Sequence, residues 1–315
     1  MNLIEVFLGT LEVTLPVFAM VFIGIALKRA GWIDQAFIAT ASSLVFRATM
    51  PTLIFLSIIK ADLSVAFNPR LLGFFTLATL MTFFMAWCWA AWRVPYEDRG
   101  VYVQGSFRGN GGIVGLALAA SMYGTAGLSA AGLLIGVVIL SYNVLSVIVL
   151  SAYQPGQRTN WRSIIAHIVH NPLILSVLVA LPLALLSITL PGWVMTSGEY
   201  FASLTLPLAL ICIGATLSIS ALRNDNGSAM SASLMKMVFL PLAATALAWL
   251  VGFSGPELGL LFLFFASPSA AASFVMVKAM GGNAKLAANI IAISTLMASV
   301  TVTAGVFLLQ VLSLI

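Results

Sequence analysis

The sequence contains very little charge. Asp, Glu, Lys and Arg make up 7% of its 315 residues, whereas globular domains typically carry about 25%. Hydrophobic residues make up 61%, and the mean hydropathy is +1.11. These values exclude a soluble globular domain and indicate an all-α integral membrane protein, because a chain this apolar must place most of its length in lipid.

Cysteine and histidine are also scarce, with two residues of each. Cys88 and Cys212 lie singly within apolar runs, so we expect two small buried side chains with no disulfide and no metal. His167 and His170 have the spacing of one helix face, but only Asn171 adjoins them and zinc needs a third and a fourth ligand. We therefore interpret both histidines as interfacial side chains and predict no cofactor.

The apolar segments lack a constellation of catalytic residues. The sequence has no HExxH motif, and no serine–histidine or paired-aspartate arrangement falls within a predicted span. No Asp or Glu lies at mid-depth, since Glu12 falls near the outer end of the first segment, where it reaches the lipid headgroups. These absences argue against an intramembrane enzyme. They also leave no evident carboxylate to carry a coupling proton.

Polar residues divide the chain into ten apolar segments, and a helix needs about 20 apolar residues to cross a bilayer. The start of the chain lacks the basic stretch of a secretory signal, and neither end carries a lipidation motif, so we expect the first segment to be retained as a span. The linkers are short, and the most polar one lies at the midpoint. The predicted spans are residues 9–27, 36–59, 71–92, 100–122, 129–152, 171–188, 197–219, 234–253, 258–279 and 286–312.

Lys and Arg are distributed unequally between the two sets of loops. If the N-terminus lies outside, only Lys60 and Arg70 fall in outer loops, and ten cations fall in cytoplasmic loops or the adjoining span ends. Positive charge accumulates on the cytoplasmic side, so we expect both termini outside. We interpret the net charge of +5 as this signal and expect no nucleic-acid partner. The ten are Lys28, Arg29, Arg93, Arg99, Arg158, Arg162, Arg223, Lys236, Lys278 and Lys285.

Two short polar stretches, residues 106–113 (SFRGNGGI) and 266–273 (ASPSAAAS), interrupt segments of membrane-spanning length. A helix breaks inside a bilayer only where protein or a water-filled cavity satisfies the freed backbone groups. Gly tolerates unwound geometry and Pro favours a first helical turn, so we expect a helix to restart after Gly112 and another after Pro268. Each restarting N-terminus carries partial positive charge, which makes an anion the expected ligand.

The predicted substrate-binding residues lie in and around these breaks. Neutral donors bind an anion without adding charge, and the guanidinium of Arg108 binds a carboxylate through two hydrogen bonds. The alternative is that Gly and Ser serve close helix packing, and that Arg108 bonds a carbonyl of the fifth or tenth span. The predicted set is Ser106, Arg108, Asn110, Gly111, Gly112, Asn143, Ser267, Pro268, Ser269 and Ser273.

A second set of positions has an accessory role in this prediction. Arg47 lies one turn before Pro51, whose ring displaces the carbonyl of residue 47. Its guanidinium either satisfies such carbonyls, lines a dimer contact or touches the substrate. The polar residues of the tenth span either face the breaks or hydrogen-bond neighbouring helices. The accessory set is Arg47, Pro51, Pro207, Asn289, Ser294 and Thr295.

The two halves of the chain carry matching landmarks. Pro16 precedes Pro172 by 156 residues, Pro51 precedes Pro207 by 156, and Asn110 precedes Pro268 by 158. Five spans in each half is an odd number, so the second half enters the membrane in the opposite direction. The pattern predicts two inverted repeats, residues 1–153 and 171–315, joined by a cytoplasmic linker at 154–170, which is typical of secondary transporters.

Several motifs resemble those of the auxin efflux carrier family, over nearly the whole chain and in the same order. The chain departs from the family pattern at Arg47, where many relatives have Asn. The motifs are Asn-x-x-x-x-Gly-Leu-x-Leu-Ala at Asn110 to Ala119, Ser141-Tyr-Asn-Val144, Asn171-Pro172, the Pro-Leu-Ala-Leu-Ile-Cys-Ile-Gly-Ala run at Pro207 to Ala215, and Gly281-Gly-Asn283 followed by Ser294-Thr295.

This resemblance implies a ten-helix fold of the bile acid/sodium symporter type, with broken fourth and ninth helices that cross. It implies a homodimeric elevator in a bacterial inner membrane, in which spans one, two, six and seven form the scaffold and spans three to five and eight to ten form the transport core. The implied substrate is a small organic anion, a mono- or dicarboxylate such as malonate or malate, or an auxin-like carboxylate. A sodium-coupled symporter, an anion channel and an intramembrane enzyme are the alternatives, and H⁺ and Na⁺ are both open as coupling ions.

Overall fold

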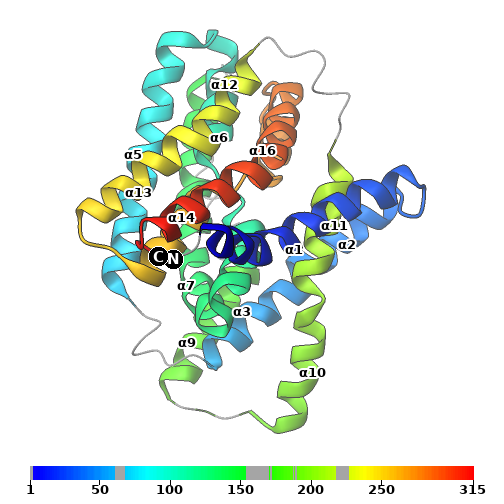
Figure 1. Cartoon of the computed structure of the whole chain (residues 1–315). Coiled ribbons are helices and arrows are strands. Elements are labelled where there is room, and N and C mark those ends of the chain that lie inside the picture. The colour runs from blue at the N-terminus through cyan, green and yellow to red at the C-terminus, as the bar shows by residue number, and fades with distance from the viewer. Residues whose placement is uncertain are drawn as a thin grey trace.

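The computed structural model describes residues 3–60, 68–153, 170, 172–186, 188, 190–217 and 227–315. Within these ranges every regular element is a helix, and β-type pairing is confined to one isolated bridge (Figure 1). The predicted all-α class is therefore confirmed for this part of the chain. The predicted linker 154–170 lies outside the described residues except for His170, as do Arg158, Arg162, His167, Asn171 and Arg223.

The α-helices are joined in places by π-helical stretches, labelled η1, η3 and η5, and by one 3₁₀ turn, labelled η2. The first half contains α1 (Leu3–Arg29), α2 (Gln35–Leu44), η1 (Val45–Thr49), α3 (Met50–Ile59), α5 (Pro69–Arg93), η2 (Tyr96–Asp98), α6 (Arg99–Phe107), η3 (Gly111–Gly115) and α7 (Leu116–Tyr153). The second half contains α9 (Pro172–Leu185), α10 (Gly192–Ser203), α11 (Thr205–Thr216), α12 (Ser228–Leu234), η5 (Met235–Phe239), α13 (Leu240–Leu250), α14 (Gly255–Phe265), α15 (Ala272–Ala279) and α16 (Ala284–Val311).

Seven helical stretches of the described residues are long and apolar enough to cross a membrane. The number differs from ten because α9 and α14 are short and because α7, with η3 before it, runs through predicted spans four and five. The chain bends inside α7 at Gly124, where φ is 59° and ψ is −139°. Only glycine adopts this backbone conformation at little cost. The count of ten spans and their inverted relation stay predictions.

Side-chain caps set several helix starts. The side chains of Asp34, Asn68 and Asn283 each accept a hydrogen bond from the backbone amide three residues later, at 2.7, 3.1 and 3.0 Å. Such caps satisfy one of the amides that a helix start leaves without a partner. The helices that follow begin at residues 35, 69 and 284, within one or two residues of the predicted span starts at 36, 71 and 286.

Two of the π-helical stretches lie directly before prolines. η1 precedes Pro51 and η5 precedes Pro241, and each proline is the second residue of the α-helix that follows. A proline ring presses on the carbonyl four residues earlier, which belongs to Arg47 in one case and Met237 in the other. An extra residue in the turn relieves this clash and widens the helix.

The helices pack in two groups, which α7 and the packing of α1 on α16 connect. α1 packs along α11, and α3 packs along α9 and α10, while α5, α6, α12, α13, α14 and α16 pack mainly on one another (Figure 1). The α1–α11 contact is made by backbone, since a Cβ added at Gly24 would lie 2.1 Å from the Ile211 oxygen, and one added at Gly214 would lie 1.8 Å from the Val21 oxygen. Small residues permit such approaches in membranes. The division into scaffold and transport core stays a prediction.

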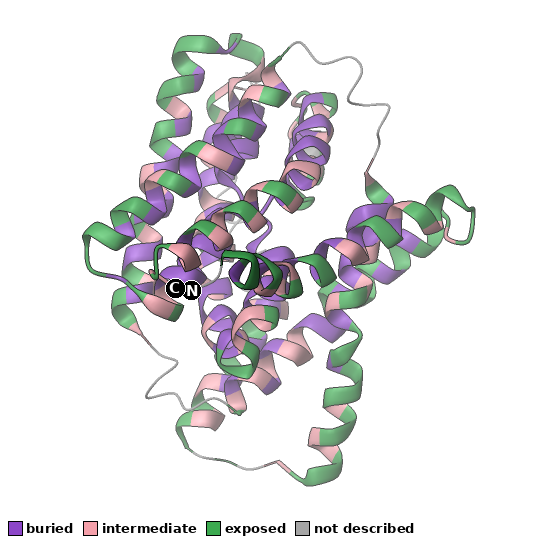
Figure 2. Cartoon of the chain, viewed as in Figure 1, coloured by how far each residue is buried: buried purple, intermediate pink, exposed green. Residues whose placement is uncertain are grey.

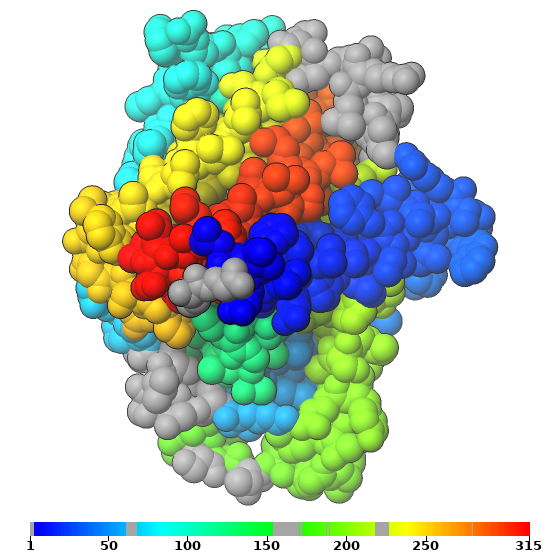
Figure 3. Space-filling model, viewed as in Figure 1, coloured from blue at the N-terminus to red at the C-terminus, as the bar shows by residue number. Residues whose placement is uncertain are grey.

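Much of the outer surface is apolar, as a lipid-facing surface requires. α10 is exposed along most of its length (Figure 2), and large apolar side chains such as Leu77, Phe84 and Trp193 are exposed. The expected burial of Cys212 is confirmed, but that of Cys88 is wrong, because this side of α5 faces outward. α1 lies beside α16 in the space-filling view (Figure 3). The rings of Phe7 on α1 and Phe307 on α16 meet edge to face, with centroids 5.7 Å apart.

Candidate functional site

The two breaks predicted from the sequence lie side by side and satisfy each other's backbone groups. α6 ends at Phe107 and α14 ends at Phe265, and the residues that follow form an antiparallel bridge between Gly109 and Ser269. The Asn110 amide donates to the Pro268 oxygen at 2.6 Å, and the Ala270 amide donates to the Arg108 oxygen at 3.0 Å. This pairing is what a non-helical backbone needs in order to persist within a membrane. We call the two segments, residues 108–110 and 266–271, the crossing.

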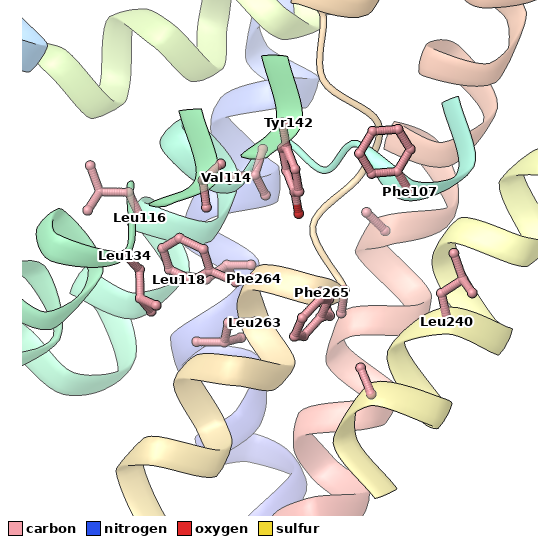
Figure 4. Close-up of a cluster of buried hydrophobic side chains, with 14 of the residues drawn as sticks. Phe107, Val114, Leu116, Leu118, Leu134, Tyr142, Leu240, Leu263, Phe264 and Phe265 are labelled. Atoms are coloured by element: carbon pink, nitrogen blue, oxygen red, sulfur yellow. The ribbon is translucent and has the colours of Figure 1, made fainter. Parts of the chain in front are cut away.

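Aromatic rings surround the crossing at the ends of both half-helices. Figure 4 shows Phe107 at the end of α6 and Phe264 and Phe265 at the end of α14. Phe107 meets Tyr142 of α7 edge to face at 5.6 Å, and Phe75 of α5 stacks on Phe265 at 4.8 Å. α6 is buried from residue 100 and α14 from residue 258 to its end. The crossing is therefore enclosed by packed side chains on these sides.

Arg108 is the charged residue of the first break and is 8% exposed. One of its terminal nitrogens donates to the backbone carbonyl oxygen of Tyr142 at 3.1 Å and to Ser146 Oγ at 3.0 Å. The other donates to Asn143 Oδ1 at 3.0 Å. Nε is buried without a hydrogen-bond partner. The predicted alternative, a carbonyl of the fifth span, is thus present as a partner. Because a guanidinium has five N–H groups, these three bonds leave it donors to spare.

The other predicted residues of the first break form a helix start. The backbone carbonyl oxygen of Asn110 accepts from the amides of residues 113, 114 and 115 and so begins η3. A Cβ on Gly111 would lie 2.9 Å from the Phe264 ring, whereas one on Gly112 would meet nothing within 4 Å. Ser106 is fully buried on α6 and bonds the Ala232 oxygen at 3.5 Å. Glycine is therefore required sterically at residue 111, while residue 112 borders open space.

The serines of the second break differ in whether their hydroxyl groups have a hydrogen-bond partner. Ser267 Oγ donates to the Phe264 oxygen at 2.7 Å, and Ser269 Oγ donates to the Gly105 oxygen. Ser273, in the first turn of α15, has a buried hydroxyl with no partner. Of the three, Ser273 therefore has a free hydroxyl, Ser269 joins the second break to α6, and Ser267 bonds the end of its own helix.

The polar residues of α16 behave in three ways. Ser294 Oγ accepts from the Ser269 amide at 3.1 Å and so supports the second break. Thr295 bonds the Ile291 oxygen of its own helix at 2.7 Å. Asn289 is buried, and its Oδ1 has no partner.

The remaining accessory residues lie elsewhere on the described chain. Arg47 is exposed in η1, in a shallow hollow lined also by Thr40, Ser43 and Ala48. Pro51 belongs to α3 and Pro207 to α11, and no hydrogen bond of the described residues joins these three positions to the crossing. The structure therefore does not bring them together with the predicted anion site.

Sequence reasoning missed Lys236. Its predicted place at a cytoplasmic span end is wrong, because α12 begins at Ser228 and Lys236 lies two turns further on, 1% exposed. Its Nζ donates to the Phe265 oxygen at 2.8 Å, at the end of α14. The small residues before it, Ser228-Ala-Met-Ser-Ala-Ser233, are a signal that could have placed the helix start earlier. Without Lys236, nine cations fall on the predicted cytoplasmic side and two on the outer side.

A cavity of about 660 Å³ lies near the crossing without including any of its residues. Its lining comes from α3, α5, α7, α10 and α14, and Leu260 in the lining lies one turn before Phe264. Lys60 forms an ion pair with Glu199 in this lining, and Asn68 donates to Glu257. On the predicted topology these charged residues all lie on the outer side. Among the described residues, no three His, Cys, Asp or Glu side chains gather as a metal site would require.

Comparison with known proteins gives one family and two relatives. Residues 10–305 match a family described as "Membrane transport protein". An uncharacterized transporter of Methanothermobacter thermautotrophicus is 25% identical over 299 residues, which cover 94% of this chain and 97% of that protein. An uncharacterized transporter of Methanocaldococcus jannaschii is 24% identical over 292 residues, which cover 90% of this chain and 94% of that protein.

Proposed function

Because the chain belongs to the membrane transport protein family, that of the auxin efflux carriers, we propose that it is a secondary transporter for a small organic anion. The substrate is a mono- or dicarboxylate such as malonate or malate, or an auxin-like carboxylate, and it crosses the membrane by alternating access. Membership in a transport family agrees with the lack of a catalytic constellation in the sequence. The proposal therefore concerns what is carried and how.

The crossing is the observation that carries this proposal. Two helices, η3 and α15, begin where the paired segments end, and helix N-termini attract negative charge. Among the described residues the buried charged side chains are Arg108 and Lys236, and no Asp or Glu is buried. Of the two, Arg108 lies in the break that precedes η3, and positive charge there without a buried carboxylate suits an anion. In transporters with broken helices, half-helix N-termini point at anionic groups in this way.

Three kinds of group bind the anion in this proposal. The first turns of η3 and α15 supply backbone dipoles, and the free hydroxyl of Ser273 supplies a neutral donor. Arg108 supplies positive charge from a fixed position, because Tyr142, Asn143 and Ser146 hold its two terminal nitrogens. Its unpartnered Nε and the second N–H of the nitrogen that bonds Asn143 are the donors left for a carboxylate.

The proposed architecture is ten spans in two inverted repeats, working as a homodimeric elevator in the inner membrane with both termini outside. The two helix groups and the cavity between α3, α10 and the helices α5, α7 and α14 support a moving core beside a scaffold. The lining of this cavity on α14 reaches Leu260, one turn before Phe264, and a cavity on the predicted outer side suits a path that a shift of the core completes. Lipid and a second copy of the chain are the proposed partners, the latter through the scaffold helices.

The test measures uptake of radiolabelled malonate and malate into proteoliposomes for the native chain and for Arg108→Ala, Arg108→Lys and Ser273→Ala. We expect Arg108→Ala to lower uptake about 10-fold to 100-fold, since a hydrogen bond to a charged group contributes roughly 1.5–3 kcal/mol. Arg108→Lys keeps the charge but loses the paired hydrogen bonds that a guanidinium donates. We expect its half-saturation concentration to rise clearly while its unfolding temperature changes little. Ser273→Ala raises the half-saturation concentration without destabilising the fold, because its hydroxyl has no partner to lose.

Arg93→Ala is the matched control, because Arg93 is an exposed cation at the end of α5 and stacks over Trp92. Its uptake should equal that of the native chain. If Arg108→Ala transports with unchanged affinity and maximal rate, Arg108 only ties α6 to α7. Steady conductance that does not saturate with anion concentration would instead indicate a channel.

A further inference from the structure

Lys236 is a buried cation that the proposed anion site does not use. It is 1% exposed, and among the described residues no buried Asp or Glu compensates its charge. Its segment is held firmly, because Tyr102 of α6 bonds Ser231 at 2.9 Å and Ser233 bonds the Ile290 oxygen of α16 at 3.4 Å. A lysine is almost never fully buried unless it is paired. Its position therefore needs an electrostatic reason.

The hydrogen-bond partner of Lys236 is the C-terminal end of the broken helix α14, and the break that follows α6 lies beside it. Nζ donates to the Phe265 oxygen at 2.8 Å, in the last turn of α14. It also lies close to Gly109, since a Cβ built on Gly109 would be 2.9 Å from Nζ, 2.7 Å from Ser267 Oγ and 3.3 Å from the Phe264 oxygen. The last carbonyls of a helix lack intrahelical partners and carry partial negative charge. The ammonium thus bonds one such end, that of α14, and lies beside Gly109, two residues after α6 ends.

The end of a broken helix at which Lys236 lies has the opposite polarity to the helix starts of the proposed anion site. Where helices break in a transporter, their N-terminal halves attract anionic substrate, while unwound carbonyls and half-helix C-terminal ends coordinate a cation such as Na⁺. In this chain the ammonium of Lys236, which donates to the Phe265 oxygen, already occupies the electronegative end of the crossing. It carries the same single charge as a sodium ion.

We propose that the ammonium of Lys236 is a resident cation that takes the place of a coupling metal cation at the crossing of the two broken helices. The carbonyl end of α14, where it adjoins the crossing, is neutralised by the chain itself, so sodium is not needed to assemble the crossing. The proposal goes beyond anion transport, because it concerns the cation that stabilises the site rather than the substrate. It predicts that shortening this side chain creates a sodium site.

The experiment measures thermal unfolding of the purified chain in sodium chloride and in choline chloride at equal ionic strength. The native chain should unfold at the same temperature in both. Lys236→Ala removes the charge and leaves room beside the Phe264 and Phe265 oxygens. Its unfolding temperature should be lower in choline and rise by about 3 °C or more in sodium, because a ligand that binds only the folded state stabilises it. Lys236→Met is the control: it is also uncharged but fills the space, so sodium should not raise its unfolding temperature.

Two results would overturn the proposal: a rise of the native unfolding temperature in sodium, or a folded Lys236→Ala that does not respond to sodium. If Lys236→Ala does not fold, the native chain alone decides, through its unfolding temperature and through anion uptake with sodium replaced by choline. Uptake that stops without sodium contradicts a resident cation. Failure to transport any anion in either salt contradicts the proposed function instead and leaves the unfolding experiment valid.

Discussion

The stretches η1 and η5 have nearly the same local sequence pattern and opposite surroundings. Each is a π-helical turn directly before a proline, and each carries one cation, Arg47 in η1 and Lys236 in η5. Arg47 is exposed on the surface of the chain, whereas Lys236 is 1% exposed and bonds the end of a broken helix. The proline explains the shared geometry. The helices packed around each stretch explain the difference.

This comparison separates what neighbouring residues determine from what distant parts of the chain determine. The widened turn follows from a proline ring pressing on a carbonyl, which can be deduced from neighbouring residues alone. Burial of the cation depends on α6 and α16, which pack against η5 although they are distant in sequence. A charge within an apolar segment is expensive, so its environment decides whether it neutralises a site or lies at the surface.

Reversing the charge of Lys236 should have the largest effect on stability. Lys236→Glu places an unpaired carboxylate against the Phe265 oxygen, and an uncompensated buried charge costs roughly 3–5 kcal/mol. That is much of the stability of an ordinary fold. We expect little monodisperse protein after detergent extraction, measured by size-exclusion chromatography.

Arg47→Glu is the matched control for this reversal. It exchanges one exposed charge for another, so we expect its stability to change by less than about 1 kcal/mol. Equal yields of the two variants would show that Lys236 is not confined as the structure indicates. A much lower yield of Arg47→Glu would show that Arg47 is the more tightly held cation.

Most of the helical fold could be predicted from the sequence, because helix starts and breaks are set by local residues. Asp34, Asn68 and Asn283 cap helices close to the predicted starts, and the two predicted interruptions are real ends of α6 and α14. The start of α12 was missed, since Gly227 precedes it with φ of 83° and no side-chain cap marks the boundary. That error placed Lys236 at a membrane surface.

The location of the two breaks could be predicted from the sequence, but the bonding between them could not. The residues 106–113 and 266–273 indicate two breaks, yet nothing local shows that Asn110 bonds Pro268 or that Ser269 bonds Gly105. These contacts join segments far apart in sequence. For the same reason the sequence left open whether Arg108 bonds substrate or a neighbouring helix, and the structure adds its partners on α7.

A glycine substitution of intermediate expected effect tests the surroundings of Lys236, because Gly109 lies beside its Nζ. Gly109→Ala would place a methyl group within 2.7–3.3 Å of Ser267 Oγ, Lys236 Nζ and the Phe264 oxygen. Overpacking of this kind costs typically about 1–3 kcal/mol, so the unfolding temperature should fall measurably in a thermal-shift assay. Gly136→Ala in α7 is the control. Its Cβ meets nothing within 4 Å, and alanine favours a helix by about 0.5–1 kcal/mol over glycine. If the two variants unfold alike, the approach of Lys236 to Gly109 is not close.

The smallest effect is expected for Arg47→Gln, which tests the exposed member of the comparison. Arg47 is exposed, and no hydrogen bond of its guanidinium appears among the described contacts, so its removal should change the stability of the single chain by less than about 0.5 kcal/mol. A hollow of small side chains around an exposed cation also suits contact with a second copy of the chain. Arg47→Gln should then lower the dimer fraction in native mass spectrometry while the unfolding temperature of the monomer stays constant. A fall of the monomer's unfolding temperature by more than about 3 °C would mean that Arg47, like Lys236, is held inside its own chain, and the contrast between η1 and η5 would be lost.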